Sequence, residues 1–196
     1  MQIDFIGPEH RLCAAARDHA RSVYRDTYGA DLRSFAPLLV AARNCDGQIV
    51  CVAGIRTAAD GFFSDTYLGG ALDQALSLLG QGQIVLDSVI EVVSLASTSP
   101  FPVLPVLDAI IGWGRARGMG WGLFTATAPL RRLLRRAGLP YTELCAARPE
   151  ALPGAESWGS YYQRDPWVCL TDGQSPRPAT LHPRTSPFPA CRAEAS

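Results

Sequence analysis

The alternation of apolar and polar positions in the first third of the chain predicts a sheet with one long helix. Gln2 to Ile6 alternates in the manner of a strand, and a helix follows from about Pro8 to Tyr28. Two apolar strands come next, Leu38 to Arg43 and Ile49 to Thr57, and the Asp46-Gly47 pair between them favours a hairpin. We therefore expect an antiparallel meander at the start of the fold.

Helices and strands alternate through the rest of the sequence. A short helix over Ala71 to Leu79, ended by Gly80-Gln81-Gly82, precedes the apolar strand Ile84 to Ser97. A helix from about Pro102 to Arg117 then leads to a strand over Trp121 to Ala126, which makes a β-α-β unit. A basic helix and two further strands complete the pattern: the helix after Thr127, and the strands Tyr141 to Ala147 and Trp167 to Thr171.

This order of elements predicts a mixed α/β (or α+β) sheet of about six or seven strands flanked by helices. The chain has 196 residues and is 47% hydrophobic, which suits one domain with a real core. We place that domain at residues 1–172. Residues 173–196 are rich in Pro, Ser, Thr and Ala without periodicity, and we expect them to be a disordered tail.

Charge and composition exclude several functional classes. The 18 basic and 18 acidic residues cancel, so the broad basic field of non-specific nucleic-acid binding is not expected. The six cysteines form no Cys-x-x-Cys pair and no His lies at ligand spacing, which argues against a metal site. The N-terminus does not resemble a signal peptide, and the longest apolar window, Phe101 to Trp113, is too short to span a bilayer. A cytoplasmic protein without stable membrane insertion is expected.

One carboxylate stands out because it lies in the middle of an apolar strand. Glu91 is the centre of Ile84 to Ser97, which reads IVLDSVIEVVSLAS. An ionised side chain in an apolar setting costs several kcal/mol unless it is paired or its pKa shifts. Glu91 is therefore either a general base beside a cleft or one half of a structural ion pair with Arg25 or Arg56.

Several separated blocks of the sequence resemble the thermostable hemolysin family. They are YRDTYGADLRSFAPLLVAA, VCVAGIRTA, FFSDTYL, IVLDSVIEVVSLAS, GWGLFTATAPLRRLLRRAGLPYTELCAA and SWGSYYQRDPWV. The resemblance covers roughly residues 5 to 172. That family is in turn similar to the GNAT acyltransferases, especially the acyl-homoserine-lactone synthases. The resemblance implies a GNAT-like twisted sheet with splayed central strands.

The same resemblance implies an N-acyltransferase and assigns residues to it. Tyr24-Arg25, Gly54-Ile55-Arg56 and Glu91 occupy the places of the family's substrate-handling elements. The donor would be an acyl thioester of coenzyme A or of an acyl carrier protein, the acceptor a small amine, and no cofactor would be tightly bound. Where the family usually has Gly-Asn, this chain has Val93-Ser94. The stretch STSPFPVLP lacks a Gly-rich phosphate loop, which favours a carrier-protein thioester or a different acyl donor over coenzyme A.

The candidates for substrate binding are also open to interpretations that involve no substrate. Arg56 and Arg25 present planar forks of donors that suit a carboxylate or phosphate, although Arg25 lies on a charged helix face and could be solvated. Tyr24 accompanies Arg25. Ser94 would face away from Glu91 on a regular strand, so only a bulge brings both to one cleft.

The donor-binding candidates follow the apolar strand in the sequence FTAT. Phe124, Thr125 and Thr127 would lie where splayed strands leave main-chain groups free for a pantetheine amide, and Thr127 is otherwise a helix N-cap. Trp158 and Tyr161 could wall an acyl pocket or cover the core. A final candidate feature is a basic face that could receive an acidic carrier protein or be solvated: Arg131, Arg132, Arg135 and Arg136.

Three functions from different classes remain open. The first is acyl transfer from a thioester to a small amine, in the biosynthesis of a specialised metabolite or signal. The second is a ligand- or partner-binding domain without chemistry. The third is direct membrane lysis, which the family name suggests and the sequence supports least, since it shows no spanning segment or strongly basic amphipathic helix.

Overall fold

A computed structural model describes residues 1–69, 72–78 and 84–173. Its strands are β1 (Gln2–Ile6), β2 (Leu38–Arg43), β3 (Ile49–Arg56), β4 (Val89–Ser97), β5 (Trp121–Ala126), β6 (Thr142–Ala146) and β7 (Trp167–Asp172). Its α-helices are α1 (Cys13–Tyr28), α2 (Leu72–Leu78), α3 (Val103–Arg115) and α4 (Ala128–Arg136). Among the shorter 3-10 helices, three bear on the site: η2 (Phe63–Leu68), η5 (Ala155–Trp158) and η6 (Tyr161–Arg164).

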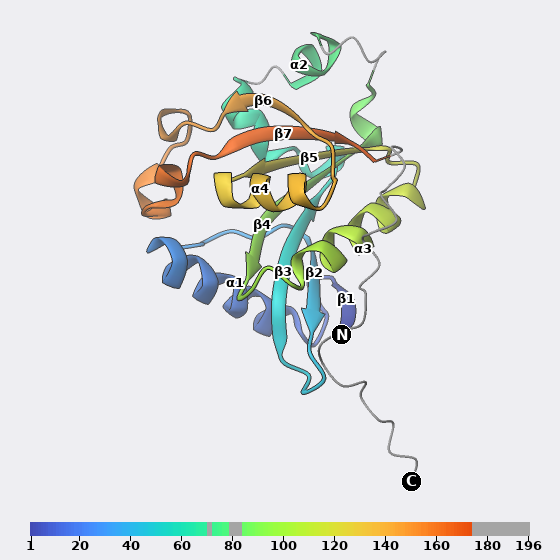
Figure 1. The fold of residues 1–196 in the computed structure, drawn as a ribbon, viewed down its shortest axis with the longest axis vertical. Coiled ribbons are helices and arrows are strands. Elements are labelled where there is room, and N and C mark those ends of the chain that lie inside the picture. Colours follow the sequence, from blue (N-terminus) through green and yellow to red (C-terminus); the bar gives the residue numbers. More distant parts are fainter. Residues whose placement is uncertain (70–71, 79–83, 174–196) are drawn as a thin grey trace.

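The seven strands form one mixed sheet in the order β1-β2-β3-β4-β5-β7-β6 (Figure 1). β4 and β5 run parallel, and every other neighbouring pair is antiparallel. The predicted meander is therefore confirmed as β1-β2-β3, and α3 makes the crossover between the two parallel strands. The fold class predicted from the sequence, a mixed sheet of six or seven strands with flanking helices, is confirmed as well.

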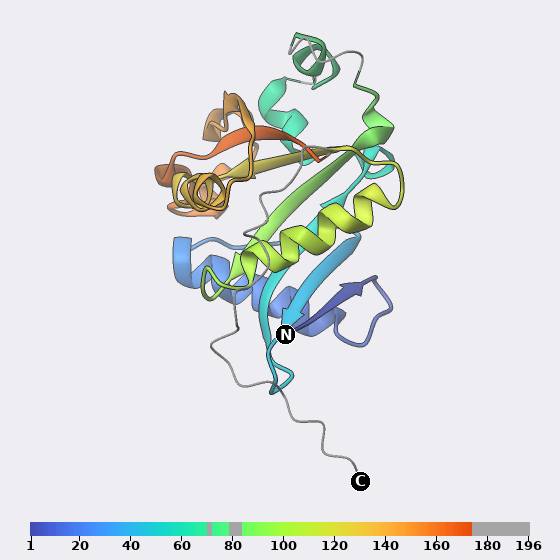
Figure 2. The same cartoon turned by 45° about the vertical axis from the view of Figure 1, so that its right-hand side comes forward.

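Helices cover both faces of the sheet, and each face has its own core. Figures 1 and 2 show α1 and α3 on opposite sides of strands β2 to β4. Alternate residues of one strand enter different cores: Leu39 and Ala41 pack with α1, whereas Val40 and Ala42 pack with α3. This is the period of two that a strand buried on both faces requires.

Some predicted boundaries are wrong at the ends of helices. α1 begins at Cys13 and not at Pro8, because the preceding segment forms turns in which the His10 N–H donates to the Gly7 carbonyl and the Leu12 N–H donates to the His10 ring. α3 is likewise shorter than predicted at both ends. The predicted stop at residues 80–82 and nearly all of the predicted tail lie outside the described residues. Within the described ranges, no helix combines the length and hydropathy that a bilayer crossing requires.

The centre of the sheet opens where β4 and β5 part. The parallel ladder pairs Val89 through Val92 with Trp121 through Phe124 and then stops. Beyond that point β4 stays paired to β3 as far as Ser97, and β5 stays paired to β7 through Ala126. The splayed central strands expected from the family resemblance are therefore present, and each leaves one edge without a strand partner.

Candidate active site

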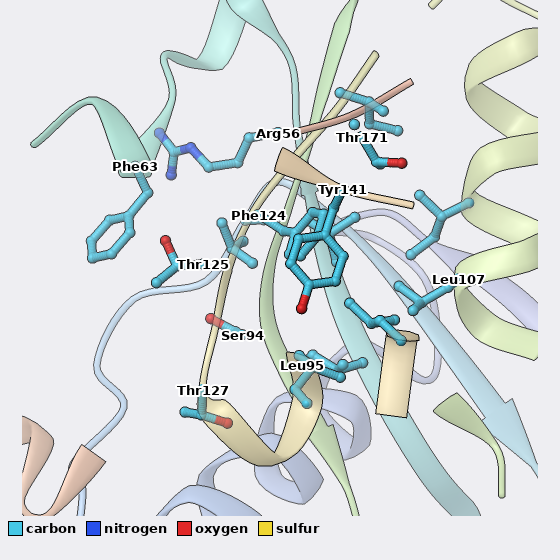
Figure 3. Close-up of a pocket in the computed structure, with 18 of the residues that line it drawn as sticks. Arg56, Phe63, Ser94, Leu95, Leu107, Phe124, Thr125, Thr127, Tyr141 and Thr171 are labelled. Carbon is cyan, nitrogen blue, oxygen red and sulfur yellow. The ribbon is translucent and has the colours of Figure 1, made fainter. Parts of the chain in front are cut away.

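A cavity of about 140 Å³ occupies the gap between the splayed strands. Residues from both faces of the sheet line it, so the cavity passes through the sheet and is not confined to one side (Figure 3). On the α1 face the lining is mostly aromatic: Tyr24, Tyr28, Phe63, Tyr67, Trp158 and Tyr161. On the α3 and α4 face it is mostly aliphatic: Leu107, Ile110, Ile111, Leu130 and Leu134.

Glu91 lies beside this cavity, completely buried, and backbone groups hold its carboxylate. The Phe63 N–H donates to Oε2 and the Ser64 N–H donates to Oε1, both at 2.7 Å. The two donors come from the start of η2, where a 3-10 helix leaves N–H groups without internal partners. Glu91 therefore fixes η2 against the sheet.

The expected alternative, an ion pair of Glu91 with Arg25 or Arg56, is not found among the described residues. Arg56 is the cross-strand neighbour of Glu91, yet its guanidinium donates to the carbonyls of Asp60 and Gly61 at 2.5 and 2.7 Å. Arg56 lines the cavity and acts on Glu91 only through its charge. Arg25 lies away from the cavity on an exposed face of α1, as the solvated alternative for it supposed.

Burial is the largest influence on the Glu91 carboxyl and raises its pKa above the ordinary 4.5. The hydrogen bonds from Ser64 and Phe63 and the positive charge of Arg56 act in the opposite direction and offset part of this rise. A carboxylate with a raised pKa is a better proton acceptor near neutral pH than an ordinary one. The electrostatics of the site therefore suit a general base.

Two hydroxyls connect Glu91 with the cavity. The Ser64 hydroxyl lowers the pKa of the Glu91 carboxyl, and its oxygen lies 3.0 Å from that of Thr125, which lines the cavity. The sequence predicted Thr125 as a donor-binding residue. It gave no sign of Ser64, because that contact joins residues far apart in the chain.

Ser94 reaches the cavity through an irregularity of β4. The β3–β4 register shifts between Val52 and Gly54, and Ser94 has a φ of 50°, in the left-handed region. The sequence had identified a bulge as the condition for Glu91 and Ser94 to serve one cleft. That condition is met, and Ser94 lines the cavity near the gap (Figure 3).

Thr127 stands at the N-cap position of α4, but its hydroxyl does not cap the helix. Burial raises the pKa of the Tyr28 phenol, and the Thr127 side chain lowers it by a smaller amount. The expected side-chain cap is thus wrong, and Thr127 lines the cavity. Phe124 lines the opposite face, with its ring 5.9 Å from that of Tyr141.

The aromatic wall is assembled from three distant segments. Tyr24 of α1 lies 6.1 Å from the Trp158 ring and 6.4 Å from the Tyr161 ring. The Phe63 ring of η2 is 5.9 Å from Trp158 as well. The candidates Tyr24, Trp158 and Tyr161 therefore meet at the cavity. Sequence reasoning missed Tyr28, Phe63 and Tyr67, for which the only signal was the density of aromatic residues in FFSDTYL and YRDTY.

The basic face predicted on α4 is largely used within the protein. Arg131 is buried, bonds to the Ala126 carbonyl at 3.1 Å and forms ion pairs with Asp165 and Glu143. Arg135 pairs with the same Glu143 at 2.7 Å. The expectation of a solvated face is therefore wrong for Arg131, whereas Arg132, Arg135 and Arg136 are exposed.

Residues 6–175 match the sequence profile of the thermostable hemolysins. The chain belongs to the thermostable hemolysin family. No curated protein matches it. Asn, which the family resemblance leads us to expect at the position of Ser94, tolerates the left-handed backbone seen there better than Ser.

Solved structures share the fold of this thermostable hemolysin family member at low sequence identity. TofI, in a ternary complex with an inhibitor and MTA, is 17% identical with a TM-score of 0.61, covering 88% of this chain and 92% of that one. The AHL synthase LasI is 11% identical with a TM-score of 0.61 over 88% and 90%. FeeM, an N-acyl amino acid synthase from uncultured soil microbes, is 15% identical with a TM-score of 0.60 over 89% and 92%.

Proposed function

We propose that this protein is an N-acyltransferase that moves an acyl group from a thioester donor to a small amine. The observation that carries the proposal is the gap between β4 and β5, which is open to both faces and has a buried carboxylate beside it. Proteins of this fold include an AHL synthase and an N-acyl amino acid synthase, and the likeness motivates the reaction class without assigning it.

The unpaired edges of the two strands suit the arm of a pantetheine thioester. Thr125 and Ala126 are paired only to β7, so their other side has no strand partner. The amide groups of an extended arm would complete hydrogen bonds there, as an added strand does at a sheet edge. The acyl chain would then lie among the aliphatic residues of α3 and α4, and the amine among the aromatic residues of the α1 face.

The start of α3 favours a carrier protein over free coenzyme A as the donor. A coenzyme A pyrophosphate is typically held by free N–H groups at a helix N-terminus. In α3 the Val103 N–H donates to the Pro100 carbonyl, Pro105 has no N–H, and the Val106 N–H donates to the Pro102 carbonyl. The first turn therefore has little to offer an anion.

The reaction needs a base because the attacking amine must lose a proton. The amine nitrogen forms a bond to the thioester carbonyl carbon, the C–S bond breaks, and the proton from nitrogen goes finally to Glu91 while the thiolate leaves. Glu91 suits this step through its burial and raised pKa, and such a base contributes about 10²–10⁴-fold to a rate.

A turnover assay with mass-spectrometric detection tests the proposal. The purified protein is incubated with acyl donors of several chain lengths, each supplied as the coenzyme A ester and on an acyl carrier protein, together with a panel of primary amines. Amide formation that depends on the protein is the expected result, with the carrier-bound donor preferred. Absence of any amide product with every combination would contradict the function.

A binding protein without chemistry is the second candidate, and the contacts of Glu91 favour it. Both carboxylate oxygens already accept backbone N–H groups of η2, which is a sufficient structural reason for a buried carboxylate. Native mass spectrometry of the protein mixed with the same donors and amines separates the two. Stable complexes without amide product would support binding alone.

A further inference from the structure

Glu91 has no direct access to a bound amine. Its side chain is fully buried, it is absent from the cavity lining, and a backbone N–H approaches each of its oxygens. If Glu91 accepts the proton of the proposed reaction, another group must carry that proton from the cavity wall.

The hydroxyl groups of Ser64 and Thr125 lie between Glu91 and the cavity, and the acceptor of each hydroxyl hydrogen can be assigned. Each hydroxyl has one hydrogen to donate. The Ser64 N–H donates to Glu91 at 2.7 Å, and the Ser64 side chain lowers the pKa of this carboxyl. Because an ionised carboxylate can only accept, we assign the hydrogen of the Ser64 hydroxyl to Glu91. In its 3.0 Å contact with Thr125, Ser64 must then accept, and the Thr125 hydroxyl donates.

This order leaves Thr125 Oγ1 with acceptor capacity at the cavity. Thr125 is the penultimate residue of β5 and follows directly on Phe124, where the pairing with β4 ends. It lines the cavity beside Phe63 (Figure 3). A hydroxyl oxygen whose own hydrogen is committed elsewhere selects a donor such as an amine N–H. The acceptor amine is thereby directed to this oxygen.

We propose that Thr125 and Ser64 form a two-hydroxyl relay that takes the proton of the attacking amine to Glu91. The inference rests on the proposed acyl transfer and names the residues that handle its proton. Thr125 is the catalytic residue that touches the amine, Ser64 is a positioning residue that links it to the base, and Glu91 is the proton acceptor.

The transfer balances in protons and electrons. As nitrogen bonds to the thioester carbonyl carbon, its proton passes to Thr125 Oγ1, the Thr125 proton passes to Ser64 Oγ, and the Ser64 proton passes to Glu91. The carbonyl re-forms with loss of the C–S bond, and the thiolate takes a proton from water. Glu91 then releases its proton along the same two hydroxyls, which restores the starting state.

The charged and titratable neighbours of Glu91 allow this cycle. Arg56 from β3 favours the ionised carboxylate through its charge, and Tyr67 from η2 stays neutral because burial raises its pKa. Glu91 is therefore ionised before the reaction more readily than burial alone would permit, and the proton it takes has no competing base among these neighbours.

The test removes the hydroxyls of the relay in Thr125→Val, in Ser64→Ala and in their double variant. Two variants serve as comparisons: Thr125→Ser, which keeps the hydroxyl, and Thr66→Val, on the exposed side of η2. Rates of amide formation are measured with the best donor and amine, from about pH 6 to about pH 9. Thr125→Val and Ser64→Ala should each lower kcat about 100-fold at neutral pH, and the double variant no further, because the two hydroxyls act in series. Thr125→Ser should recover most of the activity that Thr125→Val loses, and Thr66→Val should stay within a few fold of the parent.

The pH profile distinguishes a relay from a merely structural role. Without the relay, activity should recover as pH rises, because hydroxide can then take the proton that the attacking nitrogen must lose. A uniform loss at every pH, or full activity of Thr125→Val, would overturn the relay while leaving acyl transfer in place. No turnover by the parent protein would overturn both.

A measurement without substrate checks the assigned hydrogen bonds. Infrared spectra of the carboxyl band, taken as the difference from Glu91→Gln, report the pKa of Glu91. Ser64→Ala should raise that pKa because a donor to the carboxylate is lost, whereas Thr66→Val should not change it. An unchanged pKa in Ser64→Ala would overturn the order of donors on which the relay depends.

Discussion

The two sides of the gap in the sheet differ in chemistry and in how they are built. The side toward α3 and α4 is aliphatic and is formed by two regular helices. The side toward α1 is aromatic and hydroxyl-rich, and it combines α1 with the 3-10 segments η2, η5 and η6. A hydrocarbon chain is matched by the first surface and a small polar acceptor by the second. The difference teaches that one cavity can present a separate environment to each of two substrates.

Removing the proposed base should have the largest effect on activity. Glu91→Gln is expected to lower kcat about 10²–10⁴-fold, because the amide cannot take up a proton. The amine-side and donor-side KM values should change far less. Glu150→Gln, at an exposed position, is the matched control. Retention of parental kcat in a folded Glu91→Gln protein would show that the aromatic side holds no base.

The pH dependence of stability tests the same carboxyl. Its pKa in the folded protein lies above the ordinary 4.5, so its contribution to stability is fully present below about pH 4.5 and is lost as pH rises through the folded pKa. Glu91→Gln lacks this dependence. Urea denaturation should therefore show the variant gaining stability relative to the parent as pH rises, and a pH-independent difference would contradict the shift.

Filling the aliphatic side should change selectivity for the acyl chain without affecting the amine. Leu107→Trp introduces a large ring into this part of the cavity. Each methylene that no longer fits loses about 0.8 kcal/mol, which is about fourfold in kcat/KM. Long-chain donors should therefore lose about tenfold or more, while the shortest donors and the KM for amine stay close to the parent. Equal loss for all donors would place the chain elsewhere.

A single hydrogen bond behind the aromatic side provides a smaller effect. The hydroxyls of Tyr67 and Tyr162 lie 2.9 Å apart. Tyr162→Phe should lower the free energy of unfolding by about 0.5–1.5 kcal/mol, because one hydroxyl is left without this partner. Urea denaturation measures the change, and activity should fall only modestly. If Tyr162→Phe lowered activity more than Leu107→Trp does, the aromatic side of the cavity would be the one that tolerates substitution less.

Backbone strain at the edge of the gap should give the smallest change. Ser94 adopts a φ of 50°, which Asn tolerates better than most residues. Ser94→Asn is expected to stabilise the protein by up to about 1 kcal/mol. Thermal unfolding would detect the gain. A loss of stability would mean that the left-handed backbone does not favour Asn at this position.

Most of the fold could be predicted from the sequence, because local patterns of residues determine these elements. The hairpin with Asp46-Gly47, the β-α-β unit and the buried character of the Glu91 strand all follow from spacing and composition over short windows. The start of α1 did not, because a hydrogen bond from Leu12 to the His10 ring replaces the expected first turn.

The site was harder to predict from the sequence, because the contacts that form it join segments far apart in the chain. The partners of Glu91 lie 27 and 28 residues earlier in the chain, and no periodicity relates them. Arg131 belonged to an apparently solvated run, yet its ion pairs with Glu143 and Asp165 form only when β6 and η6 fold against α4. Residue type identified which groups were unusual, and tertiary packing determined what they bind.

The close approach at Gly159 ties the aromatic wall to completion of the whole fold. A Cβ built at Gly159 would lie 2.1 Å from the Tyr28 carbonyl oxygen, and the Ser160 N–H donates to that same oxygen at 2.8 Å. The end of α1 and the segment before β7 are thus locked together across more than a hundred residues of chain. A partly folded molecule would lack this wall, so ligand binding on the α1 side can serve as a reporter of the intact native state.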